Sequence, residues 1–308
     1  MTKLASPELA LLRATARELC ARPQSAGEIA AMGWTGLLVA EERGGAGWCP
    51  FEAAAISGEL GRAGHGSAWI GSAVAAGALS RCAPDDGRLP GLLHGSLAGA
   101  IAVGSAPRSV GHPDVVVVCD DALGVVDGAK VVSAPDPTAL DLERDVRTLD
   151  LSGASVTTIG DGADADLIAG LSRLLVAADA LGATSVARER LVEHLRTRIA
   201  FGQPLASFQA IQHRVVDLLV FELRAGAIIA RAAREAAAEG PGFTRSAAAA
   251  HAFVVGRVVP AVDECVQLSG GIGFTWEYPL HHELRRAVAD TALAGSARLS
   301  RSVVAAAW

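Results

Sequence analysis

The feature that most constrains the fold is a change of hydrophobic period, which occurs twice along the chain. From residue 167 to residue 198 there is no proline, and apolar residues recur at helical spacing. A second helical run covers residues 207–239 and stops at Gly240-Pro241-Gly242. Two further runs cover residues 243–269 and 280–307. Long antiparallel helices joined by short turns predict a four-helix bundle.

Ahead of this bundle the period changes. Short segments rich in β-branched residues predict a small antiparallel β-domain, with strands at residues 100–103, 114–119, 123–126, 129–132, 146–151 and 156–159. The first hundred residues are again helical in pattern, with helices expected at 7–21, 25–32, 51–63 and 67–80. We therefore expect a mainly α protein with a central β-domain. The predicted domains are an N-terminal helical domain (1–98), a truncated β-domain (99–163) and a C-terminal helical bundle (164–308).

Two clusters of polar residues have the composition of metal sites. Asp161, Asp164 and Asp166 are spaced like the start of a calcium loop, but the rest of an EF-hand is missing. A solvated linker is the favoured interpretation. His281, His282 and Glu283 could supply metal ligands, yet adjacent helical positions do not share a face, which favours a surface role. We expect no metal.

Composition excludes several classes of protein. With 51% hydrophobic and 19% charged residues the chain is not a disordered one, and a net charge of −6 offers no basic surface for nucleic acid. Five cysteines without a C-x-x-C pair indicate neither a disulfide framework nor a zinc cluster, and favour a reducing cytosol. The N-terminus has no signal-peptide core, and the least charged stretch, residues 66–80, is too short to span a bilayer. We expect a cytoplasmic protein that does not bind membranes.

A first segment with possible chemistry covers residues 198–213. Arg198 ends one long helix, Gly202 and Pro204 form a turn, and Gln209 and Gln212 share a face of the next helix. An arginine with primary amides at a helix–helix corner suits a pyrophosphate and the edge of a nucleobase. Spacing alone favours the alternative, an ordinary turn with capping polar groups.

A second segment covers residues 267–280. Gly270, Gly271 and Gly273 follow a helix and allow positive φ and close approach of the backbone to a ligand. The alternative is a helix C-cap followed by a tight turn. A dinucleotide fingerprint is excluded because Gly271-Ile272-Gly273 lacks a third glycine and follows a helix instead of a strand.

Taken together, the two segments resemble a known family. Arg-x-x-Phe-Gly-x-Pro, then Phe-Gln-x-x-Gln-His, then Gln-x-x-Gly-Gly-x-Gly-Phe-Thr-x-Glu-x-Pro-Leu-His resemble the C-terminal domain of acyl-CoA dehydrogenases. Residues 33–47 resemble the helix-to-glycine turn of that family, and residues 89–95 its run into the middle β-domain. The resemblance spans almost the whole chain and implies the order α, β, α.

The resemblance also implies site residues. In the family, the matching residues contact the FAD of a neighbouring subunit, and here they are Arg198, Phe201, Gln209, Gln267, Gly270 and Gly271. Arg173 matches an arginine near the acyl-CoA site of the family, and the alternative for it is a surface arginine on a bundle helix.

The chain departs from the family where its chemistry takes place. Family members remove an α-proton with a glutamate while the β-hydride passes to the flavin, and the glutamate stands at one of two positions. Here those positions hold Ser172 and Ala294, and neither can serve as a base at neutral pH. The middle-domain stretch that touches the flavin ring is replaced by residues 103–109, and the strand that backs the ring by residues 130–135. We therefore expect no catalytic residue in this chain.

The sequence thus resembles the shorter subunit of heteromeric, steroid-degradation type acyl-CoA dehydrogenases. This implies an α2β2 complex in which the chain completes the FAD site of a longer partner that acts on an acyl-CoA, with an electron-transferring flavoprotein as a candidate acceptor. One alternative is a divergent member with other chemistry on a CoA ester, using Asp217, Glu222 or Glu277 as base. Another is a structural subunit without any ligand.

Overall fold

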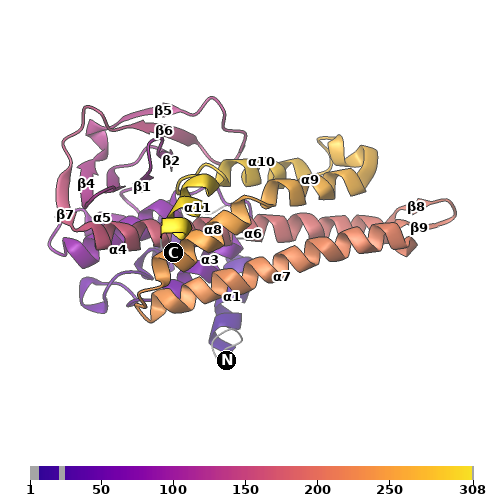
Figure 1. Ribbon diagram of the computed structural model, residues 1–308, viewed down its shortest axis with the longest axis horizontal. Coiled ribbons are helices and arrows are strands. Elements are labelled where there is room, and N and C mark those ends of the chain that lie inside the picture. The colour runs from indigo at the N-terminus through magenta and orange to yellow at the C-terminus, as the bar shows by residue number, and fades with distance from the viewer. Residues whose placement is uncertain (1–6, 21–24, 307–308) are drawn as a thin grey trace.

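The computed structural model describes residues 7–20 and 25–306. The N-terminal part is helical, as expected (Figure 1). Its helices are α1 (Pro7–Leu19), α2 (Ala26–Ala31), α3 (Pro50–Arg62), α4 (Trp69–Cys82) and α5 (Leu89–Leu93), with 3-10 turns η1 (Trp34–Gly36) and η2 (Glu41–Arg43). The α2 helix begins at a capping box, in which the Ser25 hydroxyl accepts from the Glu28 amide and the Glu28 carboxylate accepts from the Ser25 amide.

The middle part is a pair of small sheets. The strands are β1 (Gly99–Val103), β2 (Arg108–Val110), β3 (Val115–Cys119), β4 (Leu123–Asp127), β5 (Val132–Pro135), β6 (Val146–Asp150) and β7 (Thr157–Gly160). One sheet has the order β1-β3-β4-β7 and the other β2-β6-β5. Pairing is antiparallel throughout these two sheets except between β1 and β3, which run parallel.

Two details of the β-domain differ from the sequence-based expectation. The strand β2 was not predicted, because three residues are too few to show the alternation of apolar and polar side chains that indicates a strand. The strand expected at residues 129–132 starts only at Val132, since Gly128–Lys130 form the 3-10 turn η3. The Asp127 carboxylate caps this turn by accepting a hydrogen bond from the Ala129 amide.

The C-terminal part is the predicted bundle of long helices. It contains α6 (Gly162–Thr197), α7 (Gln209–Ala237), α8 (Phe243–Val255), α9 (Val258–Ser269), α10 (Leu280–Asp290) and α11 (Ala297–Ala306). The run expected over 243–269 is broken at Gly256, and the run over 280–307 is broken at Ala294 and Gly295, whose φ angles are +54° and +84°. The expected helix end at Ala307 lies outside the described residues.

The acidic segment before the bundle is part of α6, so the expected solvated linker is wrong. Asp161 is the N-cap of the helix, and its carboxylate accepts from the Asp164 amide at 3.0 Å while Asp164 accepts from the Asp161 amide at 3.2 Å. These carboxylates satisfy the free amides of the first turn and complement the helix dipole. Within residues 7–20 and 25–306, no group of three or more His, Cys, Asp or Glu side chains is placed to hold a metal ion.

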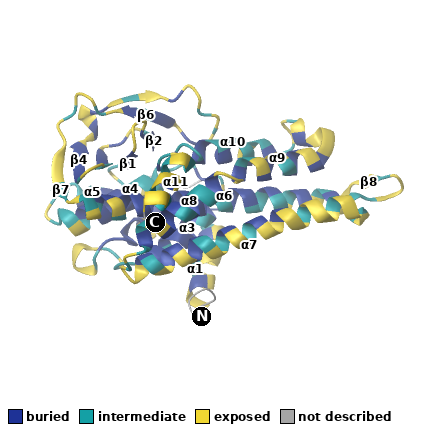
Figure 2. Cartoon of the chain, viewed as in Figure 1, coloured by how far each residue is buried: buried dark blue, intermediate teal, exposed yellow. Residues whose placement is uncertain are grey.

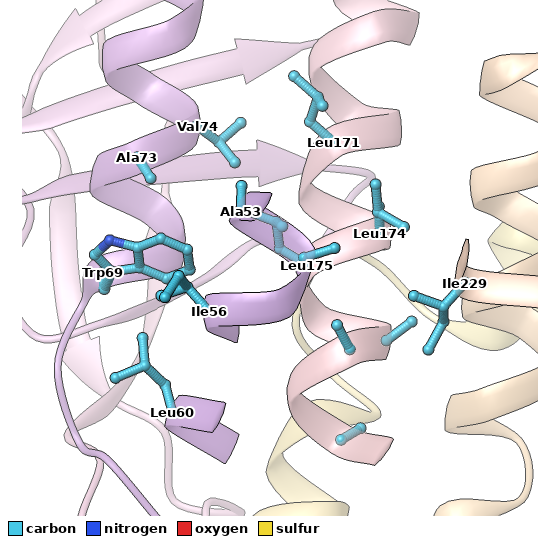
Figure 3. Packing of buried hydrophobic residues seen from close by; sticks show 14 of the residues in the cluster. Ala53, Ile56, Leu60, Trp69, Ala73, Val74, Leu171, Leu174, Leu175 and Ile229 are labelled. Atoms are coloured by element: carbon cyan, nitrogen blue, oxygen red, sulfur yellow. The ribbon is translucent and has the colours of Figure 1, made fainter. Parts of the chain in front are cut away.

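The helix α6 is the centre of the molecule, and helices from both ends of the chain pack on it (Figure 2). Side chains of α3, α4 and α6 meet around Ile56, Val74 and Leu175 (Figure 3). A Cβ on Gly61 would lie 2.0 Å from the Asp179 carbonyl oxygen, so α3 and α6 touch through their backbones. By length and composition α6 could cross a membrane, but 89% of its most apolar window is buried inside the protein. Its apolar character is explained by this central position.

Candidate functional site

The first predicted segment forms the tip of the α6–α7 hairpin. Arg198 is the exposed C-cap of α6, and a two-residue ladder between β8 (Ile199–Ala200) and β9 (Gln203–Pro204) leads to a 3-10 turn, η4 (Leu205–Ser207). Phe201 is 95% exposed with φ +52°, and its ring meets the edge of the Phe208 ring at a centroid distance of 6.3 Å. Gln209 is the exposed first residue of α7. The side chains of Arg198, Phe201 and Gln209 are therefore all exposed to solvent at the tip of this hairpin.

The second predicted segment forms a ledge at the end of α9. Gln267 is exposed on the last turn, and Gly270 leaves the helix with φ +68° before the 3-10 turn η5 (Gly270–Phe274). A Cβ placed on Gly270 or Gly271 would meet no atom within 4 Å, whereas one on Gly273 would lie 2.5 Å from the Val266 carbonyl oxygen. The backbone of the first two glycines is therefore open to a ligand, and the third glycine is needed for packing.

The structure brings the two segments to the same end of the bundle (Figure 1). The Tyr278 hydroxyl, just after the ledge, donates to the carbonyl oxygen of Arg190 at 2.9 Å, and the Tyr278 ring lies 5.6 Å from the His194 ring on α6. Arg190 also forms an ion pair with Glu283 on α10. These contacts tie the ledge to the last turns of α6, next to Arg198. We call the combined surface of residues 198–209 and 267–276 the distal site.

Large apolar side chains stand exposed around the distal site. Phe274 is 66% and Trp276 68% exposed on the ledge, and Phe201 is 95% exposed on the hairpin tip. The Arg285 guanidinium lies over the Trp276 ring, 5.3 Å from the ring centroid, in a cation–π contact. Clustered exposed aromatic residues are typical of a surface that a ligand or another subunit covers.

The two positions of the missing base lie elsewhere, where the β-domain meets α4, α6 and α10. Ser172 and Ala294 are 4% and 8% exposed and line the same cavity, as the family resemblance implies for equivalent positions. The volume of this cavity is about 40 Å³. A water molecule needs about 10–15 Å³ of such volume, whereas ligand pockets typically measure about 300–1,000 Å³. The cavity can hold water, but neither a flavin ring nor an acyl group.

A buried cluster of charges closes this region; we call it the junction cluster. Arg144, from the β5–β6 loop, donates to Asp290 on α10 at 2.5 Å and to Asp179 on α6 at 3.0 Å. Arg286 donates to both carboxylate oxygens of Asp179 at 3.0 and 2.8 Å and to the His65 carbonyl oxygen at 2.7 Å. Burial, followed by the negative charge of Asp179, raises the pKa of Asp290 to about 8. Asp290 therefore binds its proton more tightly than an exposed aspartate does.

The junction cluster was missed at the sequence level. Its members come from loop 136–145, α6 and α10, so no spacing rule connects them. The one available signal was Asp179, a carboxylate inside the long apolar run of α6. A buried carboxylate requires a cationic partner, but the sequence does not show which arginine supplies it.

Arg173 is only 3% exposed, so the alternative interpretation of Arg173 as a surface arginine on a bundle helix is wrong. Its Nε atom has no hydrogen-bond partner, and burial lowers its pKa. It does not line the cavity beside Ser172, so a role in binding substrate stays a prediction. None of the three alternative bases lines that cavity either: Asp217 and Glu277 are exposed and Glu222 is paired with Arg188 at 2.6 Å.

Comparison with known proteins identifies the family. The model of the acyl-CoA dehydrogenase N-terminal domain matches residues 7–88, and that of the acyl-CoA dehydrogenase C-terminal domain matches residues 167–308. The chain belongs to the acyl-CoA dehydrogenase family. The predicted resemblance and the predicted fold class are thereby confirmed.

Individual relatives of this acyl-CoA dehydrogenase family member include heteromeric ones. The acyl-CoA dehydrogenase IpdE2 of Mycobacterium tuberculosis is 31% identical over 280 residues, which cover 87% of this chain and 80% of IpdE2. The ChsE4–ChsE5 complex from Mycobacterium tuberculosis has a chain of the same fold, with a TM-score of 0.83, 20% identity and coverage of 98% and 97%. A chain of the Tcur3481–Tcur3483 steroid acyl-CoA dehydrogenase gives a TM-score of 0.82, 22% identity and coverage of 97% of each chain.

Members of this family bind FAD. The distal site fits the diphosphate and adenosine part of such a group, because it combines an exposed guanidinium, two exposed amides and an open glycine backbone. The region of Ser172 and Ala294 does not fit the flavin ring, since its cavity measures about 40 Å³.

Proposed function

We propose that this chain is the subunit of a heteromeric, flavin-dependent acyl-CoA dehydrogenase that completes the FAD site of a longer partner and does not itself abstract the substrate proton. One observation carries the proposal. The two positions that could hold the base, Ser172 and Ala294, flank a cavity of about 40 Å³ without a carboxylate. The partner must then supply both the base and the pocket for the reacting groups.

The residues of this chain have binding roles in the proposal. The exposed Arg198 guanidinium donates to the diphosphate, and its fork geometry matches phosphate oxygens. The side-chain amides of Gln209 and Gln267 form hydrogen bonds with the adenosine. The backbone at Gly270 and Gly271 allows the diphosphate to approach closely. When bound, FAD supplies the hydride acceptor of the family's reaction.

The exposed aromatic residues of the distal site support a partner subunit. In the single chain, Phe201 is 95% exposed and Trp276 is 68% exposed. Burying these side chains under a partner would stabilise the assembly by about 25 cal/mol per Å² of apolar surface removed from water. Two of the related structures are complexes of two differently named chains, ChsE4–ChsE5 and Tcur3481–Tcur3483. We therefore propose an α2β2 assembly with a longer acyl-CoA dehydrogenase.

The substrate and setting are proposed from the same relatives. One related structure is named a steroid acyl-CoA dehydrogenase, which supports an acyl-CoA thioester derived from a steroid. An electron-transferring flavoprotein is the proposed electron acceptor, and a structure with that name shares the fold. The five cysteines are all free, which suits the reducing cytoplasm.

The test compares the chain alone with the chain co-expressed with a longer homologue that has an intact glutamate. We expect flavin absorbance and dehydrogenase activity only in the complex. In the complex, Arg198→Ala should lower FAD affinity at least tenfold, while Arg196→Ala, an exposed arginine two residues earlier on α6, should not. Stoichiometric FAD and full activity in the chain alone would refute the proposal, and FAD retained by the Arg198→Ala complex would leave a purely structural role.

A further inference from the structure

A second hollow lies on the opposite face of α6 from the Ser172 cavity. Its volume is about 390 Å³, against about 40 Å³ for the cavity that holds the lost base positions. Four helices line it, α1, α3, α6 and α7, which lie together in the lower half of Figure 1. This volume falls within the range of about 300–1,000 Å³ that small-molecule pockets occupy. Neither the FAD site nor the base positions use it.

Small residues create this hollow. Gly226, Ala230 and Ala233 on α7 face it, and none has a side chain long enough to fill it. Gly58 and Gly182 also line it, but they let α3 and α6 pack closely, because a Cβ on Gly182 would lie 2.0 Å from the Gly58 carbonyl oxygen. A Cβ added to Gly226 would meet its first neighbour, Leu181 Cδ2, only at 4.0 Å. The other apolar lining residues are Phe51, Leu181, Leu223 and Ile229. The floor is therefore apolar and spacious.

The charged residues at the hollow are paired, with one exception. Glu59 is held by Arg17 through two contacts of 3.0 Å, and Glu222 by Arg188 at 2.6 Å. Arg62 is paired with Glu189 at 2.6 Å. Arg13 also lines the hollow and has no carboxylate partner among the residues that the structure describes.

The unpaired arginine lies next to another cation. Arg13 and Arg17 are four residues apart on α1, so their side chains lie on the same face, where Glu59 accepts from Nε and Nη2 of Arg17. Three arginines and two glutamates line the hollow, which leaves an excess of one positive charge. A single negative group at the mouth would balance this charge and accept charge-assisted hydrogen bonds from Arg13 and from Nη1 of Arg17, which Glu59 does not occupy.

We propose that this hollow binds an amphiphile with one carboxylate, such as a free long-chain carboxylic acid. The carboxylate contacts Arg13 and Arg17 at the mouth, and the alkyl chain lies along Leu223, Ile229 and Ala230. Burial of the alkyl chain against this apolar floor supplies most of the affinity, and the arginines select the charge of the head group. This site is independent of the FAD site and of the proposed function.

The charge preference is tested by calorimetric titration of the full-length chain with dodecanoate and with the cationic dodecyltrimethylammonium, both below their micelle concentrations. We expect saturable binding of one dodecanoate and at least tenfold weaker binding of the cation. Arg13→Gln should weaken dodecanoate binding about tenfold, the equivalent of one lost charge-assisted hydrogen bond. Equal affinity for anion and cation, or no dodecanoate binding to the wild-type chain, would overturn the proposal.

The location is tested by filling the hollow. Gly226→Leu places a side chain in it and improves helix propensity, so we expect a folded protein that no longer binds dodecanoate. The matched control is Ala227→Leu, the adjacent and exposed residue of α7, which should bind as the wild type does. Ala230→Leu is a second filling variant, one turn further along the same face. Unchanged binding in both filling variants would show that the hollow is not the site.

Discussion

The distal site lies at the C-terminal end of α6 and the junction cluster at its middle, and the two differ in how their polar groups are satisfied. At the distal site, Arg198, Gln209 and Gln267 are exposed, and the glycine backbone beside them is open. At the middle of the helix, Asp179 is buried in the junction cluster, where Arg144 pairs with it and with Asp290. A binding site must leave polar groups free for its ligand, whereas buried polar groups that pair with one another hold the fold together.

If the junction cluster is structural, removing one member should cost more stability than any other single change considered for this chain. Asp179→Ala leaves two arginines without their shared carboxylate, and we expect a loss of about 3–5 kcal/mol in the free energy of unfolding. Urea denaturation measures it. The control is Glu264→Ala, which breaks a partly exposed pair with Arg214 and should cost at most about 1 kcal/mol. Equal losses in the two variants would contradict the contrast.

The same cluster predicts an unusual pH dependence. Asp290 has a pKa raised to about 8 by burial and by Asp179, so the folded protein holds a proton that the unfolded chain releases near pH 4. Stability should therefore fall as pH rises from about 4 to about 8 and then level off, by at most about 1.4 kcal/mol per pH unit. Arg144 and Arg286 lower the pKa of Asp179 despite its burial, so its own contribution changes only below about pH 4.

Asp290→Asn tests this dependence, because an amide keeps an acceptor for Arg144 but cannot titrate. We expect the variant to lose the downward slope between pH 4 and 8, measured as the free energy of unfolding in urea at several pH values. A variant with the same slope as the wild type would show that another group binds the proton.

The contrast between the distal site and the junction cluster also separates what the sequence could predict from what it could not. The distal site was predicted because its residues lie in two contiguous motifs, and the helices that carry it follow a local period of 3.6 residues. The junction cluster depends on contacts between Arg144, Asp179 and Asp290, whose spacing along the chain is set by the tertiary fold. Local rules do not reach such contacts.

The errors in the predicted helices have the same origin. The break at Ala294 and Gly295 was missed because an alanine at positive φ goes against its local preference. Conversely, Asp161 was predicted to lie in a linker, because the acidic composition of its segment favoured that interpretation. The structure shows that Asp161 is the N-cap of α6 and accepts a hydrogen bond from the Asp164 amide, a local pattern that the prediction did not use.

The open glycine backbone of the distal site can be tested separately from the fold. Gly271→Ala adds a Cβ that meets no atom within 4 Å and has no positive φ to strain, so the free chain should keep its stability within about 0.5 kcal/mol. In the complex, the same methyl group would stand where the diphosphate approaches, and we expect at least a tenfold loss of FAD affinity. Gly270→Ala serves as the comparison, because its φ of +68° makes it cost about 1–2 kcal/mol in the free chain as well. A Gly271→Ala complex with normal FAD affinity would remove this ledge from the site.

We expect the smallest effect on stability from a substitution of Phe201. The FAD affinity of the same variant in the complex tests the function of the distal site most directly. Phe201 is 95% exposed at φ +52°, a conformation that glycine adopts without strain, so Phe201→Gly relieves about 1 kcal/mol of backbone strain. The lost edge contact with Phe208 and the greater freedom of glycine in the unfolded chain offset this gain, and we expect a net change within about 0.5 kcal/mol. In the heteromeric complex, however, FAD affinity should fall about tenfold, because an exposed ring in a strained conformation is retained only where it makes a contact in the assembly. A loss of more than about 1 kcal/mol in the free chain, with unchanged FAD binding in the complex, would instead make Phe201 a structural residue of the α6–α7 tip.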